Sequence, residues 1–246
     1  MNLEYKISNW LKEYLISSNL ESFVIGVSGG IDSAVASTLC AMTGIKTYIL
    51  IMPIHQKLDE TNRGIEHYKW LKDRYNNVEK VQIELTEAYN EIKNAIPDSF
   101  HSKLSLANTR ARIRMTTLYA IAGSSKGIVV GTGNKVEDFG VGFFTKYGDG
   151  GVDISPIADL MKSDVFNLGK KMGIINSILS ASPTDGLWDD GRTDEDQLGV
   201  SYDELEWAMD NNNPSNKYEE RILSTYKKHR KSNLHKMKRI PIFKVK

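Results

Sequence analysis

A short turn near the start of the chain carries residue types that bind a phosphate group. The sequence GVSGGIDS, residues 26–33, joins a run of apolar residues to a segment with helical periodicity. Gly29 and Gly30 permit backbone conformations closed to other residues, so the chain can approach a ligand closely. The N–H groups at the start of a helix favour an anion there, and Ser28 and Ser33 add hydroxyl donors. The turn is therefore expected to bind phosphate.

This turn differs from the common nucleotide-binding loops. It has no lysine, which the G-x-x-x-x-G-K-[ST] loop requires, and it lacks the G-x-G-x-x-G spacing of dinucleotide-binding folds. It carries Asp32 instead, and a carboxylate beside a phosphate is repelled unless a cation lies between them. Mg²⁺ is held in this way, by one or two carboxylates together with phosphate oxygens. Asp32 is therefore a candidate metal ligand; the alternative is an acid that stabilises the first turn of a helix.

Strands and helices alternate along the chain and must position this turn. Apolar runs predict strands at 23–27, 46–52, 78–85 and 127–132, with a short fifth strand expected within 153–160. Helical periodicity predicts helices at 3–15, 31–42, 60–75, 88–96, 104–122, 162–172, 202–211 and 217–236. This alternation predicts an α/β fold, an open doubly wound and mostly parallel sheet of about five strands with helices on both faces. We expect a single domain over residues 1–246.

Ligands of such sheets bind beyond the carboxyl ends of the strands. This rule selects the segments after residues 27, 52, 85 and 132. The last of these begins a glycine-rich stretch, GNKVEDFGVGFFTKYGDGGV at 133–152, and an acidic segment that we expect to be a mobile loop follows at 180–201. We expect parts of both segments, 140–151 and 185–200, to close over substrates.

The composition is that of an ordinary globular protein. Its formal net charge of +1 over 246 residues provides no global field for nucleic acid or an acidic membrane. No segment approaches ~18 consecutive apolar residues, and the N-terminal segment, which contains Glu4 and Glu13 and no apolar core of adequate length, is not a signal peptide. Cys40 is the single cysteine and lies in an apolar run, so we expect a buried thiol and a cytoplasmic protein without disulfides. Residues 227–246 hold nine Lys or Arg, two His and no acid, which indicates either a solvated tail or a local phosphate-binding patch.

The SGGIDS stretch resembles the PP-loop of the N-type ATP pyrophosphatases, which have the adenine nucleotide alpha-hydrolase type of Rossmann-like fold. Members bind the pyrophosphate end of ATP, cleave between its α and β phosphates, and adenylate a substrate. The resemblance explains the absent lysine, because the leaving group is pyrophosphate and no γ-phosphoryl group is passed onward. NAD synthetases, GMP synthetases, asparagine synthetases and tRNA-thiolating enzymes share this loop.

Three further stretches separate these members. They are NTRARIRM (108–115), GTGNKVEDFGVGFFTKYGDGGVDISPIADLMKSDV (131–165) and SPTDGLWDDGRTDEDQLGVSYDELE (182–206). Their order and their residues resemble those of the ammonia-dependent NAD synthetases of bacteria. The resemblance covers this chain from about residue 3 to 240. The resemblance implies an enzyme that amidates deamido-NAD with ATP, Mg²⁺ and free ammonia, through an adenylated carboxylate, and releases AMP and pyrophosphate. It also implies a homodimer with the substrate site at the subunit interface.

The resemblance also implies which residues form the site. Mg²⁺ would be bound by Asp32 and Glu137. Because the spacing from Glu137 to Lys146 is one residue longer here than in many members, Asp138 is the alternative second ligand. ATP would be bound by Gly26, Val27, Ser28, Gly29, Gly30, Ile31, Asp32, Ser33, Thr132, Lys162 and Thr184. Deamido-NAD would be bound by Arg112, Lys146, Asp153, His235 and Lys236. The expected catalytic residues are Asp32, Lys162 and Asp153, of which Asp153 would orient or deprotonate ammonium.

Other functions remain open at this point. Another PP-loop ligase, of the GMP-synthetase-like or tRNA-modifying kind, is one alternative. A nucleotide sensor that retains the loop without chemistry is another. Free ammonia is the expected nitrogen source, because the chain has no room for a glutaminase domain and Cys40 lies in a helix core.

Overall fold

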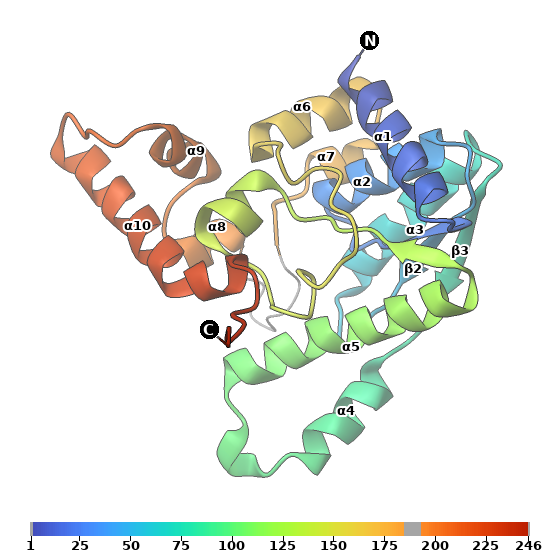
Figure 1. Ribbon diagram of the computed structural model, residues 1–246, viewed down its shortest axis with the longest axis horizontal. Coiled ribbons are helices and arrows are strands. Elements are labelled where there is room, and N and C mark those ends of the chain that lie inside the picture. Colours follow the sequence, from blue (N-terminus) through green and yellow to red (C-terminus); the bar gives the residue numbers. More distant parts are fainter. Residues whose placement is uncertain (1, 185–192, 246) are drawn as a thin grey trace.

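The computed structural model describes residues 2–184 and 193–245. Its centre is a sheet of four parallel strands, β1 (Ser22–Gly26), β2 (Thr47–Ile51), β3 (Val78–Gln82) and β4 (Gly127–Val129). The spatial order is β3-β2-β1-β4, so the order reverses at β1. Ligands of doubly wound sheets bind at such a reversal, beyond the carboxyl ends of the strands. The predicted open, parallel, doubly wound sheet is confirmed (Figure 1).

The expected fifth strand is reduced to a single parallel bridge between Val130 and Ile154. Asp153 explains why no ladder forms there, because its Oδ2 accepts a hydrogen bond from the Val129 N–H at 2.9 Å. An adjacent strand would have used that donor. Pro156 follows closely and has no N–H of its own. The described sheet therefore has four strands where about five were predicted.

Helices cover both faces of the sheet, as predicted (Figure 1). On one face lie α1 (Leu3–Ser17), α2 (Ile31–Met42), α3 (Leu58–Lys72), α6 (Lys162–Met172) and α7 (Asn176–Leu179). On the other face lie α4 (Thr86–Ala95) and α5 (Lys103–Ser124). Alternate residues of β1 point to the two cores: Phe23 and Ile25 join the first and Val24 the second. Cys40 is fully buried in the first core, as expected.

A third group of helices lies beyond the carboxyl ends of the strands. It comprises α8 (Asp194–Leu198), α9 (Tyr202–Asp210) and α10 (Lys217–Met237), which pack with a π-helix, Lys135–Val141. The helix α8 lies within the segment expected to be an irregular loop, and a capping box at Thr193 begins it. In the described part of the chain, no helix is long and apolar enough to cross a membrane.

The π-helix lies in the glycine-rich segment, which sequence reasoning left without regular structure. Asn134 caps it, because its side-chain oxygen accepts hydrogen bonds from the N–H groups of Val136 and Glu137, both at 3.0 Å. Gly142 ends it in the left-handed region, at φ +70°. A π-helix closes its hydrogen bonds over one residue more than an α-helix. It therefore holds Glu137 in a regular, capped segment of the backbone.

Candidate active site

A cavity of about 770 Å³ opens at the carboxyl edge of the sheet. The turn after β1, the segment after β2, the first turns of α5, the glycine-rich segment and the end of α10 all contribute to its wall. Every residue predicted for ATP binding lines it: Gly26, Val27, Ser28, Gly29, Gly30, Ile31, Asp32, Ser33, Thr132, Lys162 and Thr184. The fold thus brings segments that are far apart in the sequence to one place.

The turn after β1 has a backbone that only glycine allows at its centre. Gly29 lies at φ +87°, and a Cβ there would lie 2.6 Å from the carbonyl oxygen of Glu60 in α3. Ser33 Oγ donates to the Gly30 carbonyl at 3.0 Å and accepts from the Ser28 N–H at 3.2 Å, so hydroxyls fix the shape of the turn. No described side chain caps the start of α2. Its first N–H groups are therefore left to an anion.

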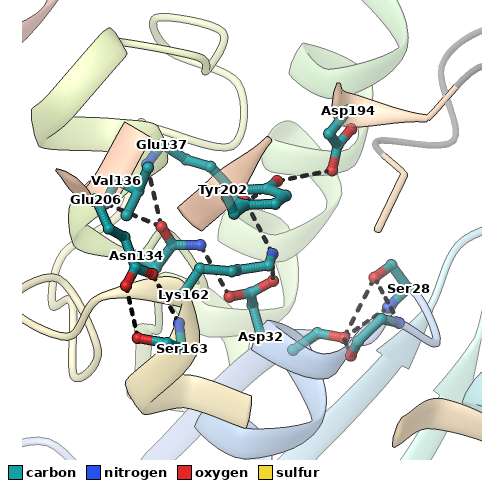
Figure 2. A network of polar contacts seen from close by, with 12 residues as sticks. Ser28, Asp32, Asn134, Val136, Glu137, Lys162, Ser163, Asp194, Tyr202 and Glu206 are labelled. Carbon is teal, nitrogen blue, oxygen red and sulfur yellow. Dashed lines mark hydrogen bonds and ion pairs between the residues drawn. The ribbon is translucent and has the colours of Figure 1, made fainter. Parts of the chain in front are cut away.

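A buried ion-pair network lies beside this turn (Figure 2). The ammonium of Lys162, the first residue of α6, donates to Asp32 Oδ2 at 2.6 Å and to Glu137 Oε1 at 2.8 Å. The Lys162 side chain is only 3% exposed, and the Asp32 and Glu137 side chains are 18% and 15% exposed. Two acids from separate elements therefore share one cation in the cavity wall.

Two residues that the sequence analysis missed, Asn134 and Tyr202, hold the two acids. Asn134 is fully buried, and its Nδ2 donates to Asp32 Oδ1 at 3.0 Å while its Oδ1 caps the π-helix that carries Glu137. The Tyr202 hydroxyl, at the start of α9, lies 2.5 Å from Glu137 Oε1 and 3.1 Å from Asp194 Oδ2. Figure 2 shows these side chains converging from different elements.

The sequence carried a signal for one of these two residues only. Asn134 follows β4 at the carboxyl edge of the sheet, where polar residues are candidates for the site. Tyr202 carries no such signal, because α9 reaches the site through the packing of the third group of helices.

Burial and neighbouring opposite charges shift the pKa values of this network in opposite directions. Burial would lower the pKa of Lys162, but Asp32 and Glu137 outweigh it and raise that pKa, so the ammonium stays charged. Burial disfavours the ionised form of Glu137, yet Lys162 and the hydrogen bond from Tyr202 outweigh burial and lower its pKa. For Asp32, burial is the stronger influence and, with the nearby charge of Glu137, raises the pKa. Two carboxylates that share one ammonium leave the site short of positive charge.

This donor set fits Mg²⁺ held jointly with a nucleotide. Asp32 and Glu137 already enclose one cation, the ammonium of Lys162. Among residues 2–184 and 193–245, no group of three or more His, Cys, Asp or Glu could hold a metal by itself. A metal that also binds substrate phosphates needs only one or two carboxylates. Metal binding by Asp32 and Glu137 therefore stays a prediction that the geometry favours.

The alternative ligand, Asp138, lies elsewhere in the cavity wall. Its side chain turns against Gly133, where a Cβ would fall 1.9 Å from Asp138 Oδ2. Burial, with the charges of Asp149 and Glu137, raises the pKa of Asp138 well above its ordinary value. The structure thus brings Glu137, and not Asp138, into contact with Lys162, which also contacts Asp32.

Four of the five residues predicted to bind deamido-NAD line the same cavity: Arg112, Lys146, His235 and Lys236. Arg112 Nε donates to the Lys146 carbonyl at 3.2 Å, and Lys236 Nζ donates to the Phe144 carbonyl at 2.7 Å. The helices α5 and α10 therefore hold the glycine-rich segment from two sides. The basic C-terminal segment thus contributes His235 and Lys236 to the cavity wall, and its phosphate-binding role stays a prediction.

The fifth predicted residue, Asp153, is not among the residues that line this cavity. Its Oδ1 accepts from the Tyr119 hydroxyl at 2.7 Å and its Oδ2 from the Val129 N–H at 2.9 Å. Both carboxylate oxygens are thus engaged between α5 and the edge of the sheet. The structure does not bring Asp153 together with Asp32 and Lys162, and its role toward substrate or ammonium stays a prediction.

The segments predicted to close over substrates are described in part. Residues 185–192 lie outside the described residues, and Pro183 and Asp194 on either side of them line the cavity. In the glycine-rich segment, the Thr145 N–H donates to Asp149 Oδ1 at 3.0 Å and the Thr145 hydroxyl donates to Asn108 Oδ1 at 2.7 Å. These bonds order that segment against α5, and its closure stays a prediction.

The fold and the site define a nucleotide-binding α/β enzyme of the PP-loop class, in which a bare glycine-serine turn faces a pair of acids. The chain belongs to the NAD synthase family, whose model matches residues 3–246, and is a carbon–nitrogen ligase. The NH(3)-dependent NAD(+) synthetase of Mesoplasma florum is 37% identical over 209 residues, which cover 83% of this chain and 82% of the relative. The NH(3)-dependent NAD(+) synthetase of Saccharolobus solfataricus is 41% identical over 198 residues, which cover 80% and 68%.

Solved structures share the fold over almost the whole chain. The NMN synthetase from Francisella tularensis has a TM-score of 0.88 and 38% identity, and the match covers 99% of this chain and 98% of that one. The NH3-dependent NAD synthetase from Campylobacter jejuni, in complex with nitrate, has a TM-score of 0.79 over 99% and 100% of the two chains. At 24% identity the second match shows the fold alone. The two names differ in the nucleotide that is synthesised.

Proposed function

We propose that this chain amidates the nicotinate carboxylate of deamido-NAD with ATP, Mg²⁺ and free ammonia, and releases NAD, AMP and pyrophosphate. The observation that carries the proposal is that one cavity is lined both by the glycine-serine turn with its acids and by basic residues of α5 and the glycine-rich segment. One wall holds the glycine-serine turn with Asp32, Glu137 and Lys162, which suits a polyphosphate with a metal ion. The other holds Arg112 and Lys146, which suit the phosphates of a second nucleotide.

The chemistry follows from the weakness of a free carboxylate as an acyl donor, because oxide is a poor leaving group. A carboxylate oxygen attacks the α-phosphorus of ATP, the bond to the bridging oxygen breaks, and pyrophosphate leaves with the electron pair. Ammonia then attacks the carbonyl carbon, AMP leaves, and the nitrogen loses one proton. Since Asp153 lies outside the cavity wall, we assign no residue to that proton transfer.

The residues of the site contribute by position and charge. The N–H groups of the turn and the ammonium of Lys162 stabilise negative charge on the departing pyrophosphate. Arg112 and Lys146 fix the carboxylate nucleotide in the same cavity, which brings the reacting atoms together. When bound by Asp32 and Glu137, Mg²⁺ supplies Lewis-acid stabilisation of the phosphate oxygens.

Nicotinate mononucleotide is a second candidate substrate. A solved relative with 38% identity over 99% of this chain is named an NMN synthetase. Curated relatives at similar identity are named NAD(+) synthetases. Both substrates carry the same carboxylate, ribose and 5′-phosphate, so the amidation chemistry is shared. A homodimer with the site at its interface belongs to the same proposal and rests on the resemblance alone, whereas the proposed cytoplasmic location rests on the cysteine content and the N-terminal sequence.

The test compares the two substrates in one assay. Purified protein receives ATP, Mg²⁺ and ammonium with either deamido-NAD or nicotinate mononucleotide, and AMP, pyrophosphate and amide are measured. The larger kcat/KM identifies the substrate, and glutamine in place of ammonium should give no turnover. Release of ADP and orthophosphate, or ATP binding without substrate-dependent pyrophosphate, would contradict the proposal.

A further inference from the structure

Lys162 lies where the proposed function requires a metal ion. Its ammonium nitrogen is 2.6 Å from Asp32 Oδ2 and 2.8 Å from Glu137 Oε1, and these two carboxylates are the predicted metal ligands. The distances are those of charge-assisted hydrogen bonds. An ammonium group and a metal ion cannot both lie between the same two oxygens. Figure 2 shows Lys162 reaching into the network beside Asp32.

Hydrogen bonds from described residues reach three of the four carboxylate oxygens of Asp32 and Glu137, and Lys162 binds one oxygen of each acid. Asp32 Oδ1 accepts from Asn134 at 3.0 Å, and Glu137 Oε1 accepts from Tyr202 as well as from Lys162. Asn134 is fixed because its other side-chain atom caps the π-helix. Lys162 has a flexible four-carbon stem and is the donor best able to leave. A metal ion that bridges Asp32 Oδ2 and Glu137 Oε1 therefore has to displace the ammonium.

The charges lead to the same result. Within the group of Asp32, Glu137 and Lys162, two ionised carboxylates and one ammonium give a net charge of −1, and the buried Asp194, which contacts Tyr202, is a further acid nearby. A divalent cation beside the ammonium would change that charge to +1 and would bring like charges close together in a mostly buried site. Exchange of the ammonium for the divalent cation gives a neutral group instead. Lys162 and the metal are therefore competitors for Asp32 and Glu137.

A destination for the displaced ammonium lies in the same cavity. Lys162 begins α6 and lines the cavity together with the glycine-serine turn, where nucleotide phosphates are proposed to bind. A lysine ammonium forms strong charge-assisted hydrogen bonds with phosphate oxygens. When a nucleotide binds, its phosphate oxygens can therefore replace the two carboxylates as acceptors for the Lys162 ammonium.

We propose that Lys162 occupies the metal site of the nucleotide-free protein, and that Asp32 and Glu137 accept a divalent cation only when nucleotide phosphates withdraw the ammonium. This inference rests on the proposed use of ATP and Mg²⁺ at the site. It gives the reaction an order of assembly, in which metal and nucleotide enter together. The protein without nucleotide binds metal weakly, and by linkage metal and nucleotide strengthen each other's binding.

The experiment titrates nucleotide-free protein with Mn²⁺ and measures bound metal by electron paramagnetic resonance. Lys162→Met should bind Mn²⁺ at least about tenfold more tightly than the wild type, a coupling of typical size. Lys171→Met is the matched control, because it removes the same charge from the same helix but outside the site, from a half-exposed lysine that pairs with the buried Glu4 at 3.0 Å. The control should bind Mn²⁺ as the wild type does. The double variant with Asp32→Asn and Lys162→Met should lose the tighter Mn²⁺ binding of Lys162→Met.

Equal or weaker Mn²⁺ binding by Lys162→Met would overturn the inference, as would tight Mn²⁺ binding by nucleotide-free wild-type protein. Removal of Lys162 leaves two buried acids without their cation, so this variant is expected to be less stable. Lys162→Gln, which keeps a polar donor and loses the charge, repeats the test, and its melting temperature should rise with Mn²⁺ far more than that of the wild type. If wild-type protein binds no complex of Mn²⁺ with a non-cleavable ATP analogue, the proposed function fails instead.

Discussion

Replacement of Tyr202 by Phe removes one hydroxyl from the ion-pair network and keeps the ring. The hydroxyl lies 2.5 Å from Glu137 Oε1 and 3.1 Å from Asp194 Oδ2, and the residue is only 7% exposed. The ring packs in a core with Val136 and Leu205, which phenylalanine fills equally well. The substitution therefore tests the orientation of Glu137 with little change in packing.

The magnitude follows from the bond that is lost. A hydrogen bond to a charged group contributes about 1.5–3 kcal/mol. In the variant, Lys162 still holds Glu137 Oε1 at 2.8 Å, so the carboxylate is displaced but stays paired. We therefore expect the substitution to raise the activation barrier by about 1.5–2 kcal/mol. A barrier raised by that amount lowers kcat/KM by about tenfold to thirtyfold. Since Glu137 is the predicted second metal ligand, the Mg²⁺ concentration for half-maximal rate should also rise.

The assay measures AMP release at saturating ammonium while Mg²⁺ and each nucleotide are varied in turn. Tyr218→Phe is the matched control, because it removes a phenol–carboxylate hydrogen bond to Glu204 from a residue that is 58% exposed. The control should keep wild-type rates and wild-type Mg²⁺ dependence. The proposed role of Tyr202 is refuted if Tyr202→Phe also keeps wild-type rates and wild-type Mg²⁺ dependence. It is refuted as well if Tyr202→Phe and Tyr218→Phe lose activity equally.

Three further outcomes are expected. Gly29→Ala should lower the free energy of unfolding by about 1–3 kcal/mol and raise the KM for ATP, because its Cβ would lie 2.6 Å from the Glu60 carbonyl at φ +87°; urea denaturation with unchanged stability would contradict this. His67 is fully buried, and burial lowers its pKa from 6.5 to about 4, so only the unfolded chain gains its proton as the pH falls through that window. Stability should therefore drop by up to about 3 kcal/mol, which is 2.5 pH units at 1.36 kcal/mol each, and His67→Gln should remove that part of the slope in denaturation measured at several pH values. Arg112→Ala should raise the KM for the nicotinate nucleotide at least about tenfold and leave that for ATP nearly unchanged; initial-rate kinetics that show equal rises would contradict its predicted place.

Much of the fold was predictable because its signals are local. The apolar run at β1 predicts a strand buried on both faces, and Phe23, Val24 and Ile25 are fully buried. The helix α6 begins and ends where predicted, because Gly173 adopts φ +71° just after its last turn. The fifth strand was not predictable in this way. Whether the Val129 N–H pairs with a neighbouring strand or with a carboxylate depends on tertiary position alone.

The site was predictable only where its residues are contiguous. The glycine-serine turn is formed by eight neighbouring residues, and its shape follows from their residue types. The inclusion of Lys162 came from the resemblance to a family. Its place between Asp32 and Glu137 could not be derived, because it depends on the distances between three separate elements. Tyr202 joins the network by the docking of α9, for which the chain carries no local signal.

The backbone of Glu137 is fixed from both sides in the π-helix. Asn134 fixes Glu137 from the N-terminal side, because one side-chain atom holds the Glu137 N–H and the other holds Asp32. On the C-terminal side, the Phe143 N–H donates back to the Glu137 carbonyl at 2.8 Å. The position of Glu137 therefore depends on the hydrogen bonds of its own N–H and carbonyl, to a residue three positions before it and from a residue six positions after it.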